Sequence, residues 1–380
     1  IMIKRTVRGA TKHAYKRIAK PLLFKQHPDG VHRRLVKVAK ITQKTPGIRR
    51  LPKLWAYQSP LLEQDLLGIH FKNPIGLSAG FDKNIELAPT IKSVGFGFMT
   101  GGSITAENCI GNPKPWFHRL PHSKSLVVHA GLPNSGVDAV AQIIQGYPAG
   151  LFDTMPLAVS VAKTNSKQTV DDETAIADYC HSLTVLEAQG KAAWYEVNIS
   201  CPNTYGGEPF TSPDRLEQLL SAIDRLHLSR PVMLKMPINK AWSEFRELLE
   251  VIVKHDVQGV AIGNLLHERN GVDKRDKLDS KIPGNLSGKP TRKVSTELIK
   301  YTYAEYGDRL VIIGIGGVFS AYDAYTKIRA GASLVALITG MIFEGPQLIG
   351  EINAGLEKYL KRDGFSSVCE AIGADHKKRV

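Results

Sequence analysis

The chain has 380 residues, of which 43% are hydrophobic and 23% charged, a composition typical of folded proteins and not of disordered ones. Its net charge of +14 is unevenly distributed: residues 1–60 hold 16 Lys and Arg against one acid, Asp29, whereas residues 61–380 hold 34 bases and 35 acids. This disfavours a nucleic-acid binder that uses its whole surface. It leaves open a basic N-terminal segment that meets phosphates of a membrane or of RNA.

This basic segment is predicted to form a helical hairpin. Apolar residues recur at helical spacing over Lys12–Phe24 and again over Val31–Ala39, with Lys and Arg between them. A turn at His27–Gly30 separates the two helices, and Pro21 is expected to kink or divide the first. The hairpin is either a solvated cap on the main domain or a layer on an anionic membrane surface.

The chain shows no sign of secretion or of a membrane span. The N-terminus lacks the apolar core of a secretory signal, although its shortage of acids leaves a mitochondrial transit peptide open. The longest uncharged apolar run, Ala332–Phe343, is too short to cross a bilayer. The four cysteines form no C-x-x-C motif and lie near no histidine at metal-ligand spacing. We therefore expect a reduced, intracellular protein with no metal site.

From residue 70 onward, short apolar runs alternate with helical patterns, which predicts a (β/α)8 TIM barrel. The runs are Pro74–Ser78, Gly97–Gly101, Leu157–Ala162, Trp194–Ile199, Val232–Met236, Gly259–Ile262, Leu310–Ile315 and Leu334–Thr339. The helical patterns are Asn84–Val94, Thr174–Gln189, Ser212–Leu226, Trp242–His255, Ser295–Tyr306 and Ala321–Ala330. We expect an extension at 1–60, in which residues 46–60 form an irregular, proline-containing linker. The barrel is expected at 61–371 and a basic tail at 372–380.

The carboxyl ends of barrel strands carry the active site in this fold. Gly314–Gly317 and Thr339–Gly340 follow the last two strands, and together they predict a seat for a phosphate-bearing cofactor. A tight strand–helix turn explains the first of these motifs equally well. Lys235 ends a buried strand, where it would stabilise a negative cofactor such as a reduced flavin, unless it extends to the rim.

The stretch Asn198–Asn203 is the most informative for chemistry. Its two asparagines, at 198 and 203, each offer a donor and an acceptor, and they flank Cys201, which could exchange a proton with a substrate carbon. Asn264 would add a third amide, and Lys83 a cation for a substrate carboxylate. Alternatively, Cys201 is a small buried hydrophobe. A Ser/His/Asp arrangement for acyl transfer was not found in the sequence.

These motifs resemble the dihydroorotate dehydrogenase family of FMN-dependent barrels. The resemblance extends from about residue 15 to 360, and its most specific parts are Asn73–Lys83, Gly95–Phe98, Asn198–Thr204, Leu286–Gly288, Ser295–Glu297, Ile313–Gly317 and Gly331–Val335. Pro28 and His32 in the hairpin, with Phe117–Leu120, are similar to the membrane-associated, quinone-reducing class 2 enzymes. The resemblance implies oxidation of dihydroorotate to orotate in pyrimidine biosynthesis. It also implies a peripheral protein on the cytoplasmic face of the cell membrane, or at the mitochondrial inner membrane in a eukaryote.

Residue by residue, the resemblance implies the following roles. Cys201 would be the base and His32 and Arg119 would meet the quinone, while the substrate would contact Lys83, Gly131, Leu132, Asn198, Asn203 and Asn264. The FMN positions are Ala79, Gly80, Lys83, Ser103, Ser160, Asn198, Lys235, Gly263, Gly288, Gly317, Ile338 and Thr339. The implied partners are thus a small substrate, a membrane quinone and an anionic membrane surface, without nucleic acid.

The sequence departs from the class 2 pattern at several of these positions. The base is Cys201 instead of serine, and Gly131–Asn134 likewise looks like the soluble class 1 enzymes. Asparagines are replaced by Val128 on the substrate side and by Ser160 on the FMN side. A Thr or Ser is replaced by Leu265, and a tyrosine by Ile338. Losing the polar groups at 128 and 265 removes about two hydrogen bonds to substrate, each contributing roughly 0.5–1.5 kcal/mol.

Three functions are therefore compared. The first is a quinone-linked dihydroorotate dehydrogenase. The second is a related FMN oxidoreductase that acts on another cyclic or unsaturated substrate, motivated by Val128 and Leu265. The third is a degenerate FMN-binding membrane protein without activity, against which the intact Cys201, Lys83 and Lys235 argue.

Overall fold

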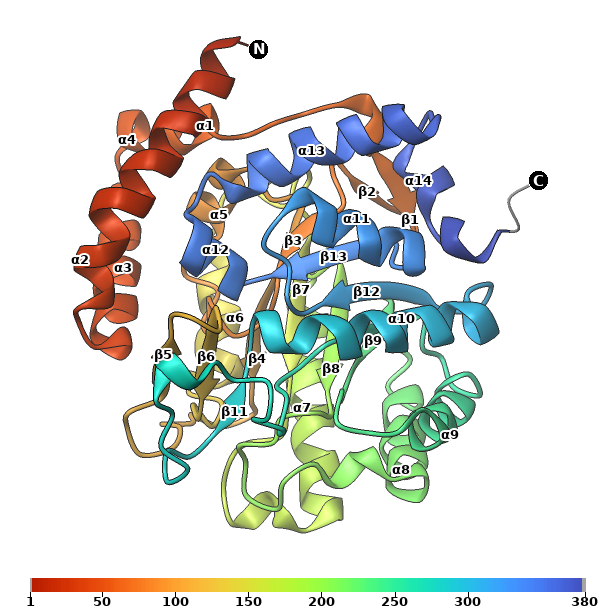
Figure 1. Ribbon diagram of the computed structural model, residues 1–380. Helices are drawn as coiled ribbons and strands as arrows, with labels where there is room; N and C mark the ends of the chain where they lie inside the picture. The colour runs from red at the N-terminus through yellow and green to blue at the C-terminus, as the bar shows by residue number, and fades with distance from the viewer. Residues whose placement is uncertain (1, 378–380) are drawn as a thin grey trace.

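Eight parallel strands form a closed barrel in the computed structural model, which describes residues 2–377 (Figure 1). This confirms the predicted (β/α)8 fold: each of the eight predicted runs overlaps a barrel strand, although the second strand extends to Ile104, beyond its predicted end at Gly101. The barrel strands, in order around the barrel, are β3 (Ile75–Leu77), β4 (Phe98–Ile104), β7 (Leu157–Val161), β8 (Trp194–Asn198), β9 (Val232–Met236), β10 (Gly259–Ile262), β12 (Val311–Ile315) and β13 (Leu334–Leu337). Nearly all of their residues are buried, because helices cover the barrel on its outer side.

The helices around the barrel include all six predicted patterns. They are α5 (Ala88–Val94), α6 (Val137–Gln145), α7 (Asp172–Gln189), α8 (Pro213–Asp224), α9 (Trp242–Ile252), α10 (Arg292–Tyr306), α11 (Ala321–Ala330), α12 (Thr339–Glu344), α13 (Leu348–Asp363) and α14 (Val368–Ala371). The prediction that α5 starts at Asn84 was wrong. The Asp82 carboxylate accepts hydrogen bonds from the backbone N–H groups of Glu86 and Leu87, which holds 82–87 in a loop.

The amino-terminal end of the barrel is closed. The hairpin of β1 (Gln64–Leu66) and β2 (Ile69–Phe71) lies there, and its Phe71 packs against Phe98 and Trp194 at ring-centroid distances of 5.8 and 5.9 Å. These three rings are at most 1% exposed. Burial of such large aromatic groups stabilises the barrel and fills its lower end. Access to the barrel interior is therefore from the carboxyl ends of the strands.

The N-terminal segment forms the predicted helical hairpin, with different boundaries. Its helices are α1 (Met2–Ala14), α2 (Lys20–Phe24) and α3 (Pro28–Thr42), and a π-helical turn (Tyr15–Ala19) joins the first two. The expected start at Lys12 was wrong, as was the turn at His27–Gly30, because α3 already begins at Pro28, a favourable first helical residue. Pro21 does interrupt the first helix: it lacks an N–H and crowds the carbonyl four residues earlier, which the π turn accommodates.

The linker is more regular than expected. Residues 46–54 form α4 (Pro46–Arg50) and a 3-10 turn (Leu51–Leu54), so the prediction of an irregular segment was wrong there. The prolines start these short helices instead of preventing them, since proline fits the first turn of a helix. Within residues 2–377, no helix is both long and apolar enough to cross a bilayer.

A small antiparallel sheet beside the barrel was not predicted. It consists of β5 (Phe117–Leu120), β6 (Ser125–Val128) and β11 (Asn285–Leu286), in the order β11-β6-β5. Helix α3 contacts β5, and Figure 1 shows α1–α3 and this sheet on the same side of the molecule. The hairpin and the sheet are thus the two added layers at the open end of the barrel.

Candidate active site

A cavity of about 250 Å³, called the main cavity below, opens where the barrel strands end. It runs from the strand ends to the hairpin, where Val31, His32 and Leu35 of α3 line it. Most of the predicted site residues line it as well: Ala79, Gly80, Lys83, Ser103, Arg119, Gly131, Leu132, Asn198, Cys201, Asn203, Lys235, Asn264, Ile338 and Thr339. The predicted base, substrate and quinone positions therefore share one space.

A second cavity of about 110 Å³, the glycine cradle, adjoins it. Its lining includes the remaining predicted cofactor glycines, 263, 288 and 317, together with Gly316 and Gly340. Gly317 has a φ of +69°, and a side chain there would meet the Cβ of Arg292 at 2.3 Å. Glycine is required here by the close approach of the chain. The resulting small, backbone-lined space suits the phosphate of a nucleotide.

Ser160 is the one predicted site residue that lines neither cavity. It is fully buried in β7, and its hydroxyl lies 2.8 Å from that of Ser103, which does line the main cavity. The strand register pairs Ser160 with Glu196 of β8, and the Ser160 hydroxyl hydrogen-bonds the Glu196 carboxyl. Ser160 therefore supports the cavity wall from below.

Glu196 was not predicted as a site residue from the sequence. It is 1% exposed, and burial raises the pKa of its carboxyl against the opposing effect of Lys235, whose Nζ lies 4.0 Å from Oε1. Lys235 is thus placed at the cavity floor with a buried carboxyl behind it. A glutamate two residues before Asn198, in an otherwise apolar strand, was the signal that could have identified it.

Cys201 follows β8 and has an electrostatically mixed environment. Burial raises the pKa of its thiol to about 11, and a backbone hydrogen bond from Asn203 and the charges of Lys235 and Lys163 oppose this rise. Glu208 interacts unfavourably with the thiolate. The thiol therefore carries its proton at neutral pH. To act as a base it must first lose that proton, which the positive charges of the nearby lysines favour.

The three asparagines expected to bind substrate already have protein partners. Asn198 donates to the Ser103 hydroxyl at 2.9 Å, and Asn203 donates to the backbone carbonyl of Val128 at 3.1 Å. Asn264 donates to the backbone carbonyl and the hydroxyl of Ser200. The amides are thus held in fixed orientations, and each has limited remaining hydrogen-bonding capacity for a ligand.

The hairpin end of the main cavity is lined by aromatic side chains. The His32 ring packs edge-on to Phe81 and Phe117, at centroid distances of 5.5 and 6.3 Å. Burial, together with the charge of Lys83, lowers the His32 pKa to about 4, so its imidazole is neutral near pH 7. Burial also lowers the Lys83 pKa to about 8, and its Nζ lies 4.7 Å from the ring centre of Trp116.

Arg119 connects the small sheet to the hairpin. Its guanidinium lies 4.7 Å from the ring centre of Phe24 and donates to the backbone carbonyl of Gln26 at 2.5 Å.

The main cavity also has apolar lining residues that were not predicted as contacts: Phe81, Leu126, Ile342 and the substituted positions Val128 and Leu265. They come from four separate segments, so only the folded chain brings them together.

A barrel whose strand ends combine a glycine cradle, a buried lysine and a cysteine beside it is the architecture of a cofactor-dependent barrel enzyme. The family model for dihydroorotate dehydrogenase matches residues 61–360, and the chain belongs to this family of flavin oxidoreductases. The predicted family membership is confirmed.

Similar proteins extend over almost the whole chain. A dihydroorotate dehydrogenase (quinone) of Gloeobacter violaceus is 34% identical over 358 residues, which is 94% of this chain and 98% of that protein. A protein of the same name from Natronomonas pharaonis has the same identity and coverage. The crystal structure of the Eimeria tenella enzyme in complex with ferulenol superposes with a TM-score of 0.78 at 26% identity, covering 92% of this chain and 96% of that one.

Proposed function

We propose that the protein oxidises dihydroorotate to orotate in pyrimidine biosynthesis, with FMN as cofactor and a membrane quinone as electron acceptor. The observation that carries the proposal is the main cavity, because Cys201 and Asn203 line it together with His32 and Arg119. Relatives named dihydroorotate dehydrogenase (quinone), at 32–35% identity over most of the chain, favour this substrate over another cyclic one.

The residues present fit FMN. The glycine cradle would take its phosphate, and Thr339 and Gly288 would border that group. Lys235 would lie beside the flavin ring, where a positive charge stabilises the electron-rich reduced form. When bound, the flavin accepts a hydride from the substrate and later releases the electrons to the quinone.

Side chains that line the main cavity would then accept the proton and hold the substrate. Cys201 accepts the proton from C5 of dihydroorotate, and Lys83 binds the substrate carboxylate. Asn198, Asn203 and Asn264 are oriented by their hydrogen bonds to protein and border the ring. The aromatic wall of Phe81 and Phe117 keeps water from the reacting atoms.

The hairpin would hold the protein at an anionic membrane surface. Ile18, Leu22, Leu35, Val38 and Ile41 are 50–62% exposed on it, between basic residues. Exposed apolar side chains flanked by Lys and Arg are typical of helices that lie in a bilayer interface. Such a location would let a quinone enter the main cavity beside His32.

Anaerobic mixing of the purified protein with dihydroorotate tests the reaction. Bleaching of flavin absorbance is expected, followed by its return when a quinone analogue is added. Absence of any bleaching would contradict the proposed substrate.

For the membrane contact, the protein is expected to float with anionic vesicles, and its flotation with zwitterionic vesicles is expected to be weaker. Retention in a high-salt wash would show that apolar contacts dominate the attachment.

A further inference from the structure

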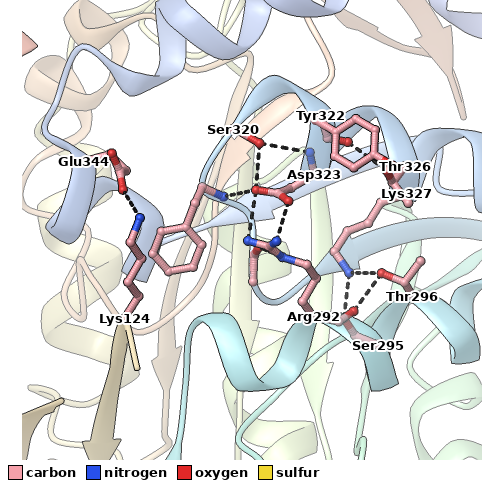
Figure 2. Close-up of polar contacts among 12 residues, drawn as sticks. Lys124, Arg292, Ser295, Thr296, Ser320, Tyr322, Asp323, Thr326, Lys327 and Glu344 are labelled. Carbon is pink, nitrogen blue, oxygen red and sulfur yellow. Dashed lines mark hydrogen bonds and ion pairs between the residues drawn. The ribbon is translucent and has the colours of Figure 1, made fainter. Parts of the chain in front are cut away.

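Lys327 of α11 is fully buried, yet among the described residues its ammonium donates to hydroxyl groups only. Its Nζ donates to the hydroxyls of Ser295 at 2.6 Å and of Thr296 at 3.0 Å, both on α10 (Figure 2). A lysine that is 0% exposed normally has a carboxylate partner, because removing an ammonium from water is costly.

The charged groups that face Lys327 do not supply that partner. Arg292 comes from α10 and Asp323 from α11, and these two pair with each other at 2.8 Å. The Asp323 carboxylate also accepts hydrogen bonds from the Phe319 N–H and the Ser320 hydroxyl, both at 2.9 Å. A further neighbouring element, β12, presents the uncharged Gly314, and α11 also packs against α13 and β13. The charges that act on Lys327 are those of Arg292 and Asp323. Among residues 2–377, then, the buried charge of Lys327 has no carboxylate partner, and burial followed by Arg292 lowers its pKa to about 7.

The ammonium lies directly behind the glycine cradle. The Ser295 hydroxyl that binds Nζ is 3.1 Å from where a side chain on Gly316 would begin, and the Thr291 hydroxyl is 2.6 Å from the same point. Gly316 and Gly317 line the cradle. One hydroxyl group thus separates the buried ammonium from the wall of the space that suits a phosphate.

We propose that Lys327 is the buried counter-charge of the flavin phosphate, acting through Ser295, and that phosphate binding draws one proton from solvent onto its Nζ. The inference rests on the proposed FMN site. It extends that proposal, because it makes cofactor binding depend on pH and on a residue that does not line either cavity. Lys327 is a positioning residue in this scheme, since it acts through another side chain.

Calorimetric titration of the full-length, flavin-freed protein tests the proposal. FMN and riboflavin are titrated at pH 8 in two buffers of different ionisation enthalpy, which gives the number of protons taken up. The second pKa of a phosphate monoester is near 6, so FMN itself enters as a dianion. Uptake of about 0.5–1 proton is expected with FMN, because a lysine with a pKa near 7 is mostly neutral at pH 8, and close to zero with riboflavin.

The variant Lys327→Met should abolish the proton uptake and weaken FMN binding about 10-fold or more, with about 2-fold or smaller change for riboflavin. Lys300→Met, at an exposed position of α10, the helix that carries Ser295, is the control and should match the wild type. In the holoprotein, the phosphorus NMR signal of FMN should shift in Lys327→Met and not in Lys300→Met.

FMN binding without proton uptake would overturn the proposal, and this wild-type measurement does not depend on a variant that folds. Equal FMN affinity of Lys327→Met and wild type would overturn it too. If neither FMN nor riboflavin binds, the flavin site itself is wrong and the proposed function fails with it.

Discussion

The side-chain amide of Asn203 donates a hydrogen bond to the backbone carbonyl of Val128, 3.1 Å away. This contact joins the loop that carries Cys201 to strand β6 of the small sheet. It uses the backbone of Val128, so the loop is held in place even though the side chain at 128 has no polar atom. The position has kept a structural role, and its side chain now contributes an apolar surface to the main cavity.

Val128→Asn is therefore expected to improve substrate binding. A new amide at this position would add one hydrogen bond to a pyrimidine ring, which corresponds to a roughly 2- to 10-fold lower KM for dihydroorotate at similar kcat. Steady-state kinetics with a quinone analogue checks this. Val128→Ile, which adds only volume, is the control and should not lower KM. An unchanged KM in Val128→Asn would show that the ring does not lie beside residue 128.

Removing the thiol should affect the reduction of the flavin and not its binding. In Cys201→Ala, the rate of flavin reduction by dihydroorotate in stopped-flow mixing should fall by about 10²–10⁴, the usual contribution of a positioned base. The flavin content should equal that of wild type. Because burial raises the thiol pKa to about 11, the thiolate fraction grows as pH rises, and the wild-type reduction rate should increase between pH 6 and 9. A flat pH profile with an unaffected Cys201→Ala variant would rule out the thiol as base.

The barrel was predictable because its strands are buried on both faces. Such strands appear as continuous apolar runs, for instance Val232–Met236, and their order along the chain fixes a parallel barrel. Helix α13 was also readable, since Leu348, Ile352 and Leu356 recur at helical spacing, but it was not identified. The small sheet carried a weaker signal: its strands have two to four residues, and β5 includes a histidine and an arginine.

The site was predictable to the extent that its residues follow strands. Cys201 and Asn264 come within three residues of the ends of barrel strands, so the topology alone places them at the open end. The partners of those residues were not predictable. The carbonyl of Val128 that orients Asn203 depends on a backbone position, and the hydroxyls that receive Lys327 lie on a different helix. Contacts of this kind are set by tertiary packing and leave no spacing pattern.

His32 is expected to act in quinone reduction as a neutral imidazole. Its pKa of about 4 means that it gains a proton only below about pH 5, so it should cause no titration in the quinone step between pH 5.5 and 8. In His32→Ala, reoxidation of the reduced flavin by a quinone analogue should slow about 10-fold, while reduction by dihydroorotate stays unchanged. His122→Ala, at an exposed position of the small sheet's turn, is the control. Equal slowing of both half-reactions would indicate a general structural effect.

Glu344 is expected to hold the hairpin on the barrel. The residue is 7% exposed, and its carboxylate pairs with Lys16 of the hairpin and, at 2.8 Å, with Lys124 of the small sheet's turn. Burial opposes ionisation of Glu344, but the hydrogen bonds from Lys124 and Lys16 outweigh it and lower the pKa. A lowered carboxyl pKa gives stability that is present above the ordinary value near 4.5 and is lost as pH falls through the folded-state pKa.

Glu344→Gln should therefore release the hairpin at neutral pH. Two partly exposed lysines lose their anion, which corresponds to about 1–2 kcal/mol after allowance for solvent screening. Limited proteolysis should then cut within residues 15–45 faster than in wild type, and the KM for a quinone analogue should rise because His32 loses its position in the cavity wall. Glu351→Gln is the matched control, since Glu351 pairs with Lys12 of the same hairpin at a more exposed site and should change proteolysis less. Equal cleavage rates in wild type and Glu344→Gln would show that apolar packing alone holds the hairpin.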